Sequence, residues 1–207
     1  LKENEHVIPL FIFDTEILQN LEDKADRRVD FIHQTLQHLK TQLEELGSSL
    51  VVLFGNPVEL WEKIEARSVY TNRDYEPYAR QRDNSVQHIL EQRGITFKAF
   101  KDQVIFDCRE VVKEDGKPYT IFTPYSRKWK SQLTKFYTRS YPTEKYFKNF
   151  QKSEPLGFHS LHDIGFEATN AVFPERIVKS SIIDHYDKLR NFPAVRGTTR
   201  CFRSPGS

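Results

Sequence analysis

Residues 6–13 read HVIPLFIF, a nearly continuous apolar run that is typical of a strand buried on both faces of a parallel sheet. After a polar loop, apolar residues recur every three or four positions through residues 27–46, which predicts an amphipathic helix. Asp26 can cap its start, and Gly47 suits a left-handed turn at its end. Residues 50–54 form a second apolar run, so we expect a strand–helix–strand unit with parallel strands. The apolar stripe of the helix consists of Val29, Ile32, Leu36, Leu39, Leu43 and Leu46.

Strand and helix patterns continue to alternate along the chain. We expect a short helix over 57–66, a strand over 68–72, a helix over 77–93, a strand over 95–100, extended segments over 104–112 and 119–122, and a helix over 125–137. This alternation predicts an α/β fold, a Rossmann-like parallel sheet flanked by helices. No GxGxxG follows any of these strands, so the usual dinucleotide fingerprint is absent.

The periodicity vanishes from residue 140 to about residue 173, where Pro, Ser, Gly, Lys and Phe mix irregularly. So long a stretch without an element is uncommon inside one domain, which favours an interdomain linker. Helical spacing then resumes. We therefore predict an α/β domain over residues 1–138, a long irregular linker over 139–173, and a helical C-terminal segment over 174–207.

The composition is that of a globular protein, with 38% hydrophobic residues and a net charge of only +2, which does not by itself indicate a nucleic-acid binder. The longest apolar run, Val7 to Phe13, is too short to span a bilayer, and we expect no membrane association. Neither a secretory signal nor a metal-like cysteine spacing is present. The low cysteine content suits a reducing cytoplasmic or nuclear setting, of which we expect the cytoplasmic one. The sequence has no methionine and leads almost directly into its first strand, so we expect a fragment of a longer protein.

Three stretches, in this order and spacing, resemble the DNA photolyase/cryptochrome family. They are NRDYEPYARQRD at 72–83, YTIFTPY at 119–125 with Trp129 behind it, and a segment from Tyr186 to FPAVRGTTR at 192–200. Each motif is weak alone, but together they are specific and cover most of the chain. The chain resembles the amino-terminal α/β antenna domain of this family, followed by the beginning of the helical FAD-binding domain.

Polar residues follow two of the expected strands. In an open parallel sheet, ligands bind beyond the carboxyl ends of the strands, and these exits offer carboxylates and an amide. The resemblance implies an antenna chromophore here, either a folate or a deazaflavin. Folate-binding members often carry Asn-Glu where this chain has Tyr78-Ala79, which favours the deazaflavin type. The candidate antenna-binding residues are Asp14, Glu16, Asn72, Asp74 and Glu76.

Simpler interpretations of these residues stay open. Asp74 and Glu76 precede a helix that begins with Pro77, so they could serve only as helix-capping groups that favour its dipole. Asp14 could be an ordinary turn residue at the end of a strand.

A glycine followed by two hydroxyls and an arginine suits an anionic diphosphate, because it presents N–H groups, hydroxyls and a guanidinium. The resemblance implies that Tyr186, Thr198, Thr199 and Arg200 contact the phosphates of FAD. The family continues with Leu-Ser where this chain has Cys201-Phe202, and most of the flavin domain would follow beyond it. We expect the present chain neither to hold FAD tightly nor to repair DNA.

The resemblance implies a light-dependent deoxyribodipyrimidine photolyase, a carbon–carbon lyase that repairs cyclobutane pyrimidine dimers by electron transfer from FAD. In a full-length protein, the domain beyond this chain would bind damaged DNA. We expect that protein to be a monomer. The alternative is a cryptochrome, a blue-light photoreceptor without repair activity. A distant third possibility is a nucleotide-binding α/β domain of unrelated role. No catalytic or metal-binding residue is assigned within this chain.

Overall fold

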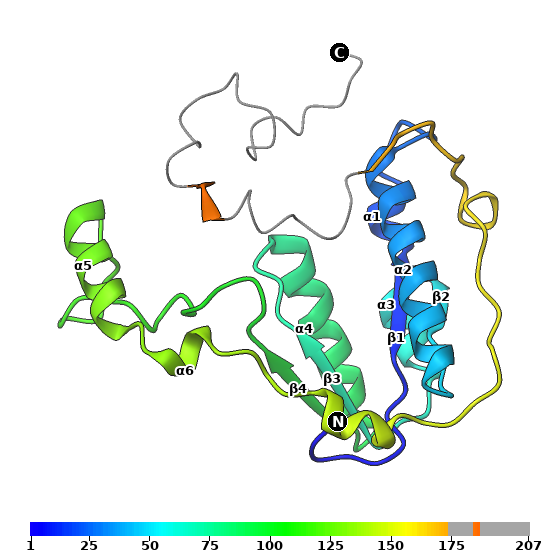
Figure 1. The fold of residues 1–207 in the computed structure, drawn as a ribbon, viewed down its shortest axis with the longest axis horizontal. Coiled ribbons are helices and arrows are strands. Elements are labelled where there is room, and N and C mark those ends of the chain that lie inside the picture. Colours follow the sequence, from blue (N-terminus) through cyan, green and yellow to red (C-terminus); the bar gives the residue numbers. More distant parts are fainter. Residues whose placement is uncertain (174–183, 187–207) are drawn as a thin grey trace. The chain divides into compact units, whose positions relative to one another are not determined.

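The computed structural model describes residues 1–173 and 184–186, and the chain divides into two compact units. Unit 1 consists of residues 1–21 and 39–159, and unit 2 of residues 22–38 and 160–207. Within the described ranges, no helix combines the length and the apolar character that crossing a membrane requires. The α/β elements follow in the order β1 (Leu10–Asp14), α1 (Thr15–Leu18), α2 (Arg27–Glu45), β2 (Val51–Gly55), α3 (Pro57–Trp61), β3 (Ser68–Asn72), α4 (Pro77–Gln92) and β4 (Thr96–Phe100) (Figure 1).

The strands pair in parallel, as the alternation of strand and helix predicts. β1 pairs with β2 and β3 pairs with β4, and each partner is reached through a helical crossover. The expected α/β fold of parallel strands flanked by helices is therefore confirmed. Among the described residues, the four strands form two separate two-stranded ladders and not one continuous ladder.

The first strand is shorter than the apolar run predicts. It begins at Leu10 and not at His6, and it extends to Asp14. Pro9 has no N–H to donate to a ladder, which delays the strand, although its carbonyl still accepts a hydrogen bond from the Val51 N–H at 3.0 Å. His6 also has a positive φ of 59°, which is incompatible with extended backbone.

The expected caps of α2 are present. The Asp26 carboxylate accepts a hydrogen bond from the Arg28 N–H at 2.8 Å, and Gly47 has a left-handed φ of 71° just beyond the helix end. The polar loop before α2 is less irregular than predicted, because the single-turn helix α1 begins directly after β1.

The buried face of α2 differs from the predicted stripe. Val29 and Leu36 are buried in unit 2, but Ile32 and Leu39 are each 41% exposed. Asp30 is buried on this helix instead. The Thr169 N–H and hydroxyl and the Gln34 amide all donate to its carboxylate, which makes burial of that charge tolerable.

The second strand pair packs its core against α4 within unit 1. Val69 of β3, Val86 and Leu90 of α4, and Ile95 form one buried cluster, and Leu90 is completely inaccessible to solvent. Trp61 of α3 packs against the same cluster. This core fixes α4 against β3, so the first turn of α4 is held near the end of that strand.

Two predictions after β4 are wrong. Residues 104–112 form turns and not a strand, because the Glu110 carboxylate accepts from the Asp107 N–H and from Lys101, which competes with ladder hydrogen bonds. Residues 119–122 do not form a strand either, because Phe122 is already the first residue of a helix that contains Pro124. Proline is tolerated there because the first N–H groups of a helix have no intrahelical partner. The expected helix over 125–137 is divided into α5 (Phe122–Gln132) and α6 (Lys135–Thr138).

The stretch without periodicity is largely irregular, as expected, but it contains two short 3-10 helices, η1 (Glu144–Asn149) and η2 (His162–Ile164). In unit 1, Val7 forms a parallel bridge with Phe150. In unit 2, Ile164 and Phe166 are buried, each 3% exposed.

Candidate functional site

Asp14 lies at the exit of β1 and accepts hydrogen bonds from two directions. One carboxylate oxygen, Oδ1, accepts from the Glu16 N–H at 3.0 Å, which makes Asp14 the N-cap of α1. The other oxygen, Oδ2, accepts from the Tyr78 hydroxyl at 2.8 Å and lies 3.5 Å from the Arg82 guanidinium. Asp14 is therefore a turn residue, as the simpler interpretation holds, and also the centre of a polar contact between β1 and α4.

The local geometry of α4 explains why Tyr78 and Arg82 meet the same carboxylate. Pro77 occupies the first position of the helix, and residues four apart then lie on one face. The Arg82 guanidinium also donates to Asp83 at 2.8 Å, and it lies 5.9 Å from the centre of the Tyr78 ring. One cation is thus shared between two carboxylates and an aromatic face.

The network perturbs the ionisation of its members. Burial, and then the hydrogen bond to Asp14, raise the pKa of the Tyr78 phenol well above its usual value of about 10, so the phenol remains a donor into the alkaline range. Burial acts to lower the pKa of Arg82, but the carboxylates of Asp83 and Asp14 outweigh it and raise that pKa. The site therefore holds a neutral phenol and a permanent cation beside a buried acid.

The exit of β3 carries the remaining candidate residues. Asp74 accepts a hydrogen bond from the Glu76 N–H at 3.1 Å, so it closes a turn just before α4. Glu76 occupies the N-cap position of α4, but its side chain makes no capping hydrogen bond there and is exposed. Asn72 is the exposed last residue of β3. The next residue, Arg73, forms an ion pair with Asp107 at 2.6 Å.

The contact between Asp14 and Tyr78 places the exit of β1 beside the first turn of α4, which follows shortly after β3. The carboxyl ends of these two strands thus lie at one edge, as the parallel arrangement predicts. Sequence reasoning missed the partners of Asp14. Their four-residue spacing at the start of a predicted helix was the available signal, because it places Tyr78 and Arg82 on one face.

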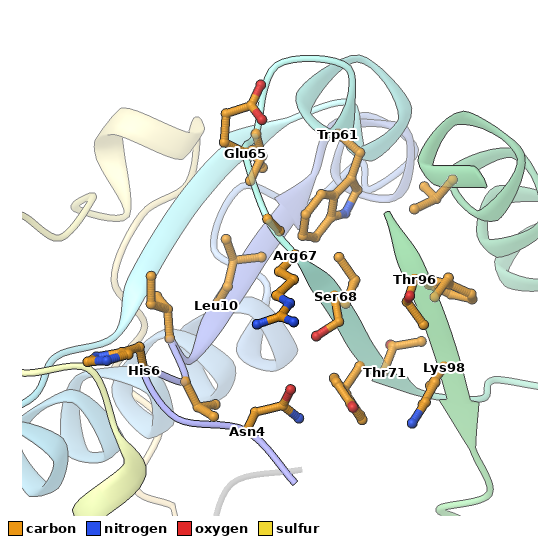
Figure 2. Close-up of a pocket in the computed structure, with 18 of the residues that line it drawn as sticks. Asn4, His6, Leu10, Trp61, Glu65, Arg67, Ser68, Thr71, Thr96 and Lys98 are labelled. Carbon is orange, nitrogen blue, oxygen red and sulfur yellow. The ribbon is translucent and has the colours of Figure 1, made fainter. Parts of the chain in front are cut away.

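A cleft of about 1450 Å³ lies beside this network, within unit 1 (Figure 2). Residues of β1 and β3 line it, and Asp14 and Arg82 lie among its lining residues. The amino-terminal segment, represented in Figure 2 by Asn4 and His6, lines it as well.

Residues 1–145 match the family model described as DNA photolyase. The chain belongs to the DNA photolyase family. The match covers all four strands and the Asp14–Tyr78–Arg82 network. The resemblance inferred from the three sequence stretches is therefore confirmed at the level of the family.

Individual relatives agree with this membership. The chain is similar to a deoxyribodipyrimidine photo-lyase of Synechococcus, with 29% identity over 95% of this chain and 44% of the relative. It is also similar to Cryptochrome-2 of Arabidopsis thaliana, with 30% identity over 59% of this chain and 21% of the relative. The fold resembles the crystal structure of a bacterial class III photolyase from Agrobacterium tumefaciens, with a TM-score of 0.63, 18% identity, and coverage of 97% of this chain and 44% of that one. This photolyase-family chain thus spans less than half the length of these relatives.

Of the four residues predicted to contact FAD, the structure describes one. Tyr186 is described and is 41% exposed. Thr198, Thr199 and Arg200 lie outside the described residues. Their assignment to flavin phosphates stays a prediction from the sequence.

Proposed function

We propose that this chain is the antenna-chromophore-binding part of a light-dependent deoxyribodipyrimidine photolyase. The observation that carries the proposal is the Asp14–Tyr78–Arg82 network, because it joins the exit of β1 to the family signature at the start of α4. Ligands of open parallel sheets bind at this edge. In this proposal residues 1–138 are the antenna domain, 139–173 the linker, and 174–207 the beginning of the flavin domain.

The side chains at this edge fall into two groups with different tasks. Asp14 already accepts hydrogen bonds on both oxygens, so we assign it to holding α4 in place and not to binding the chromophore. Glu16 after β1, Asn72 at the end of β3 and Glu76 at the start of α4 are exposed, and they offer two carboxylates and an amide. These groups fit the N–H and C=O edges of a deazaflavin or folate ring, and the partly exposed face of Tyr78 offers a stacking surface.

A titration tests the antenna assignment. The purified chain is titrated with a deazaflavin, and then separately with a reduced folate, while ligand fluorescence is recorded. We expect the chain in which Glu16 and Glu76 are both replaced by Gln to bind about tenfold more weakly, a loss of about 1.4 kcal/mol. Glu154→Gln, at an exposed carboxylate in the irregular stretch, is the matched control and should bind as the unchanged chain does. Equal affinity in all three proteins would refute the assignment.

The activity of the whole protein is part of the same proposal. FAD, when bound through the segment that includes Tyr186, Thr198, Thr199 and Arg200, would supply the electron that splits a cyclobutane pyrimidine dimer and would then recover it. The chain spans less than half the length of its photolyase relatives, so in this proposal it is inactive alone. Damaged DNA is the proposed partner of the complete protein.

The similarity to Cryptochrome-2 favours a second candidate, a blue-light photoreceptor without repair activity. A repair assay separates the two. The complete protein that carries this chain is loaded with FAD and illuminated with blue light in the presence of a dimer-containing oligonucleotide. Light-dependent loss of dimers supports the lyase. Bound flavin that is photoreduced without any loss of dimers supports the photoreceptor.

A further inference from the structure

The positive charge of the chain is concentrated in one segment. Residues 117–152 contain nine lysines and arginines and a single carboxylate, Glu144, so the segment carries a net charge of +8. Because the whole chain carries only +2, the remaining residues carry −6. The same segment contains ten of the 27 aromatic residues. It therefore combines dense positive charge with many rings, which the net charge of the whole chain does not reveal.

Phe106 joins α5 and α6 through two ring contacts. Trp129 of α5 packs edge-on against Phe106 with 5.4 Å between the ring centres, and the Tyr137 ring of α6 lies 4.8 Å from that of Phe106. Tyr125, one turn before Trp129 on the same face of α5, packs edge-on against Tyr119. Two rings of α5 are therefore used within the chain, and they fix α5 beside α6.

The cations of α5 and α6 are available to a partner. The carboxylates of the turn before α5 do not neutralise them, because Asp107 pairs with Arg73 and Glu110 pairs with Lys101. Five cations in or directly after these two helices are exposed and form no ion pair within residues 1–173 and 184–186, namely Arg127, Lys128, Lys130, Lys135 and Arg139.

Exposed rings lie in the same segment as these cations. Phe136 of α6 is 55% exposed, and Tyr141 is 74% exposed. The Arg139 guanidinium lies 5.0 Å from the centre of the Phe136 ring. Nucleobases stack on exposed rings and on guanidinium planes, and Lys and Arg pair with phosphates. This combination of groups suits a polymer that alternates phosphates with flat rings.

We propose that these five cations, together with Phe136 and Tyr141, form a surface that binds a single nucleic-acid strand, whatever its base sequence or sugar. An unpaired strand offers phosphates and open base faces together, whereas the bases of a duplex are stacked on each other. An anionic lipid surface would match the charge, but it requires a free apolar helix face, and Tyr125 and Trp129 already contact other rings of the chain. The inference goes beyond the proposed function, because it involves no lesion, flavin or antenna.

A titration of the full chain with labelled oligonucleotides tests the cations. Oligo-dT and oligo-rU of about 20 nucleotides, free of dimers, are followed in the dark by fluorescence anisotropy at several salt concentrations. The cation variant combines Arg127→Gln, Lys128→Gln and Lys130→Gln. Its matched control removes three exposed cations outside the segment through Lys63→Gln, Arg67→Gln and Arg80→Gln, so both proteins have the same net charge.

We expect the cation variant to bind both oligonucleotides about tenfold more weakly at about 50 mM salt, and the control to bind as the unchanged chain does. The slope of log K against log salt should become shallower by about 2 in the cation variant, because each phosphate contact on a single strand contributes about 0.7. Equal losses of affinity in the cation variant and its control would overturn the inference.

A ring variant, Phe136→Leu combined with Tyr141→Leu, tests whether the surface recognises more than charge. We expect it to keep the salt slope of the unchanged chain but to bind about tenfold more weakly, because base stacking is lost. If it binds as the unchanged chain does, the surface recognises charge alone and the inference is wrong. Displacement of the oligonucleotide by vesicles of equal parts phosphatidylglycerol and phosphatidylcholine, at the same phosphate concentration, would also refute it.

All of these substitutions are at exposed positions, so every variant should unfold in urea at the same midpoint as the unchanged chain. A loss of binding at an unchanged midpoint is then a loss of contacts and not of folding. Because the readout uses neither a chromophore nor light, its failure is distinguishable from failure of the antenna proposal.

Discussion

The hydrogen bond between Tyr78 and Asp14 is the clearest energetic test of the site. Replacing Tyr78 by Phe removes the hydroxyl and leaves one oxygen of a buried carboxylate with only the Arg82 guanidinium, 3.5 Å away. Hydrogen bonds to charged groups contribute about 1.5–3 kcal/mol. Tyr78 is 37% exposed, so the lower end applies, and we expect Tyr78→Phe to lower the free energy of unfolding by about 1.5 kcal/mol.

A double-mutant cycle isolates this contact from other effects of the substitution. Asp14→Asn keeps an oxygen for the N-cap of α1 but removes the charge, and we expect a similar loss of about 1.5 kcal/mol. Because both changes remove the same interaction, the double variant should lose only about 2 kcal/mol, which gives a coupling of about 1 kcal/mol. Urea unfolding followed by tryptophan fluorescence measures all four proteins. Tyr141→Phe, at a tyrosine that is 74% exposed, is the control and should change stability by less than about 0.5 kcal/mol.

Alkaline pH adds a second signature to this cycle. The pKa of Tyr78 is raised in the folded chain, so its stabilising contribution is complete below the ordinary tyrosine pKa of about 10 and declines as the pH rises further. Tyr78→Phe should therefore flatten the loss of stability above pH ~10. Additive single effects, within about 0.4 kcal/mol, together with an unchanged alkaline profile would refute the proposed contact.

Three further outcomes follow from the described contacts. The hydrogen bond from Arg28 lowers the pKa of Asp26 to about 2, so the stabilising contribution of this carboxylate is complete above pH ~4 and is lost as the pH falls toward 2. Between these pH values, urea unfolding should show that the unchanged chain loses about 1 kcal/mol more of its unfolding free energy than the Asp26→Asn variant does. The difference is no larger because solvent screens the exposed Arg28 guanidinium. Thr169→Val removes a hydroxyl donor from buried Asp30 and should cost about 1–2 kcal/mol by the same measurement. Leu90→Ala leaves a cavity at a fully buried position and should cost about 3 kcal/mol, with a smaller loss indicating that the surrounding core collapses around it.

Most helices and strands could be predicted from the sequence, because nearby residues determine where each one begins and ends. The apolar runs that became β1 and β2, and the caps at Asp26 and Gly47, act through nearby residues. The errors arose where a competing local group prevailed. Pro9 delayed a strand, and Glu110 converted an apolar stretch into turns.

The candidate site was predictable in position but not in its contacts. That Asp14 ends a strand follows from the sequence, and the parallel topology indicates which edge it reaches. Its hydrogen bond to Tyr78 joins residues 64 positions apart, and no local pattern specifies such a pair. The roles of Glu16 and Glu76 in binding a chromophore stay predictions, because exposure alone is compatible with any polar surface.

The cleft between β1 and β3 illustrates a deeper limit of sequence patterns. An apolar run such as LFIFD reports that a strand is buried, but it is the same whether the strand has one neighbour or two. The structure adds the number of neighbouring strands. Among the described residues β1 has a single partner, β2, and its Leu10 and Ile12 are only half-buried. The degree to which each apolar residue of β1 is buried therefore depends on its place in the ladder, which the apolar run alone does not specify.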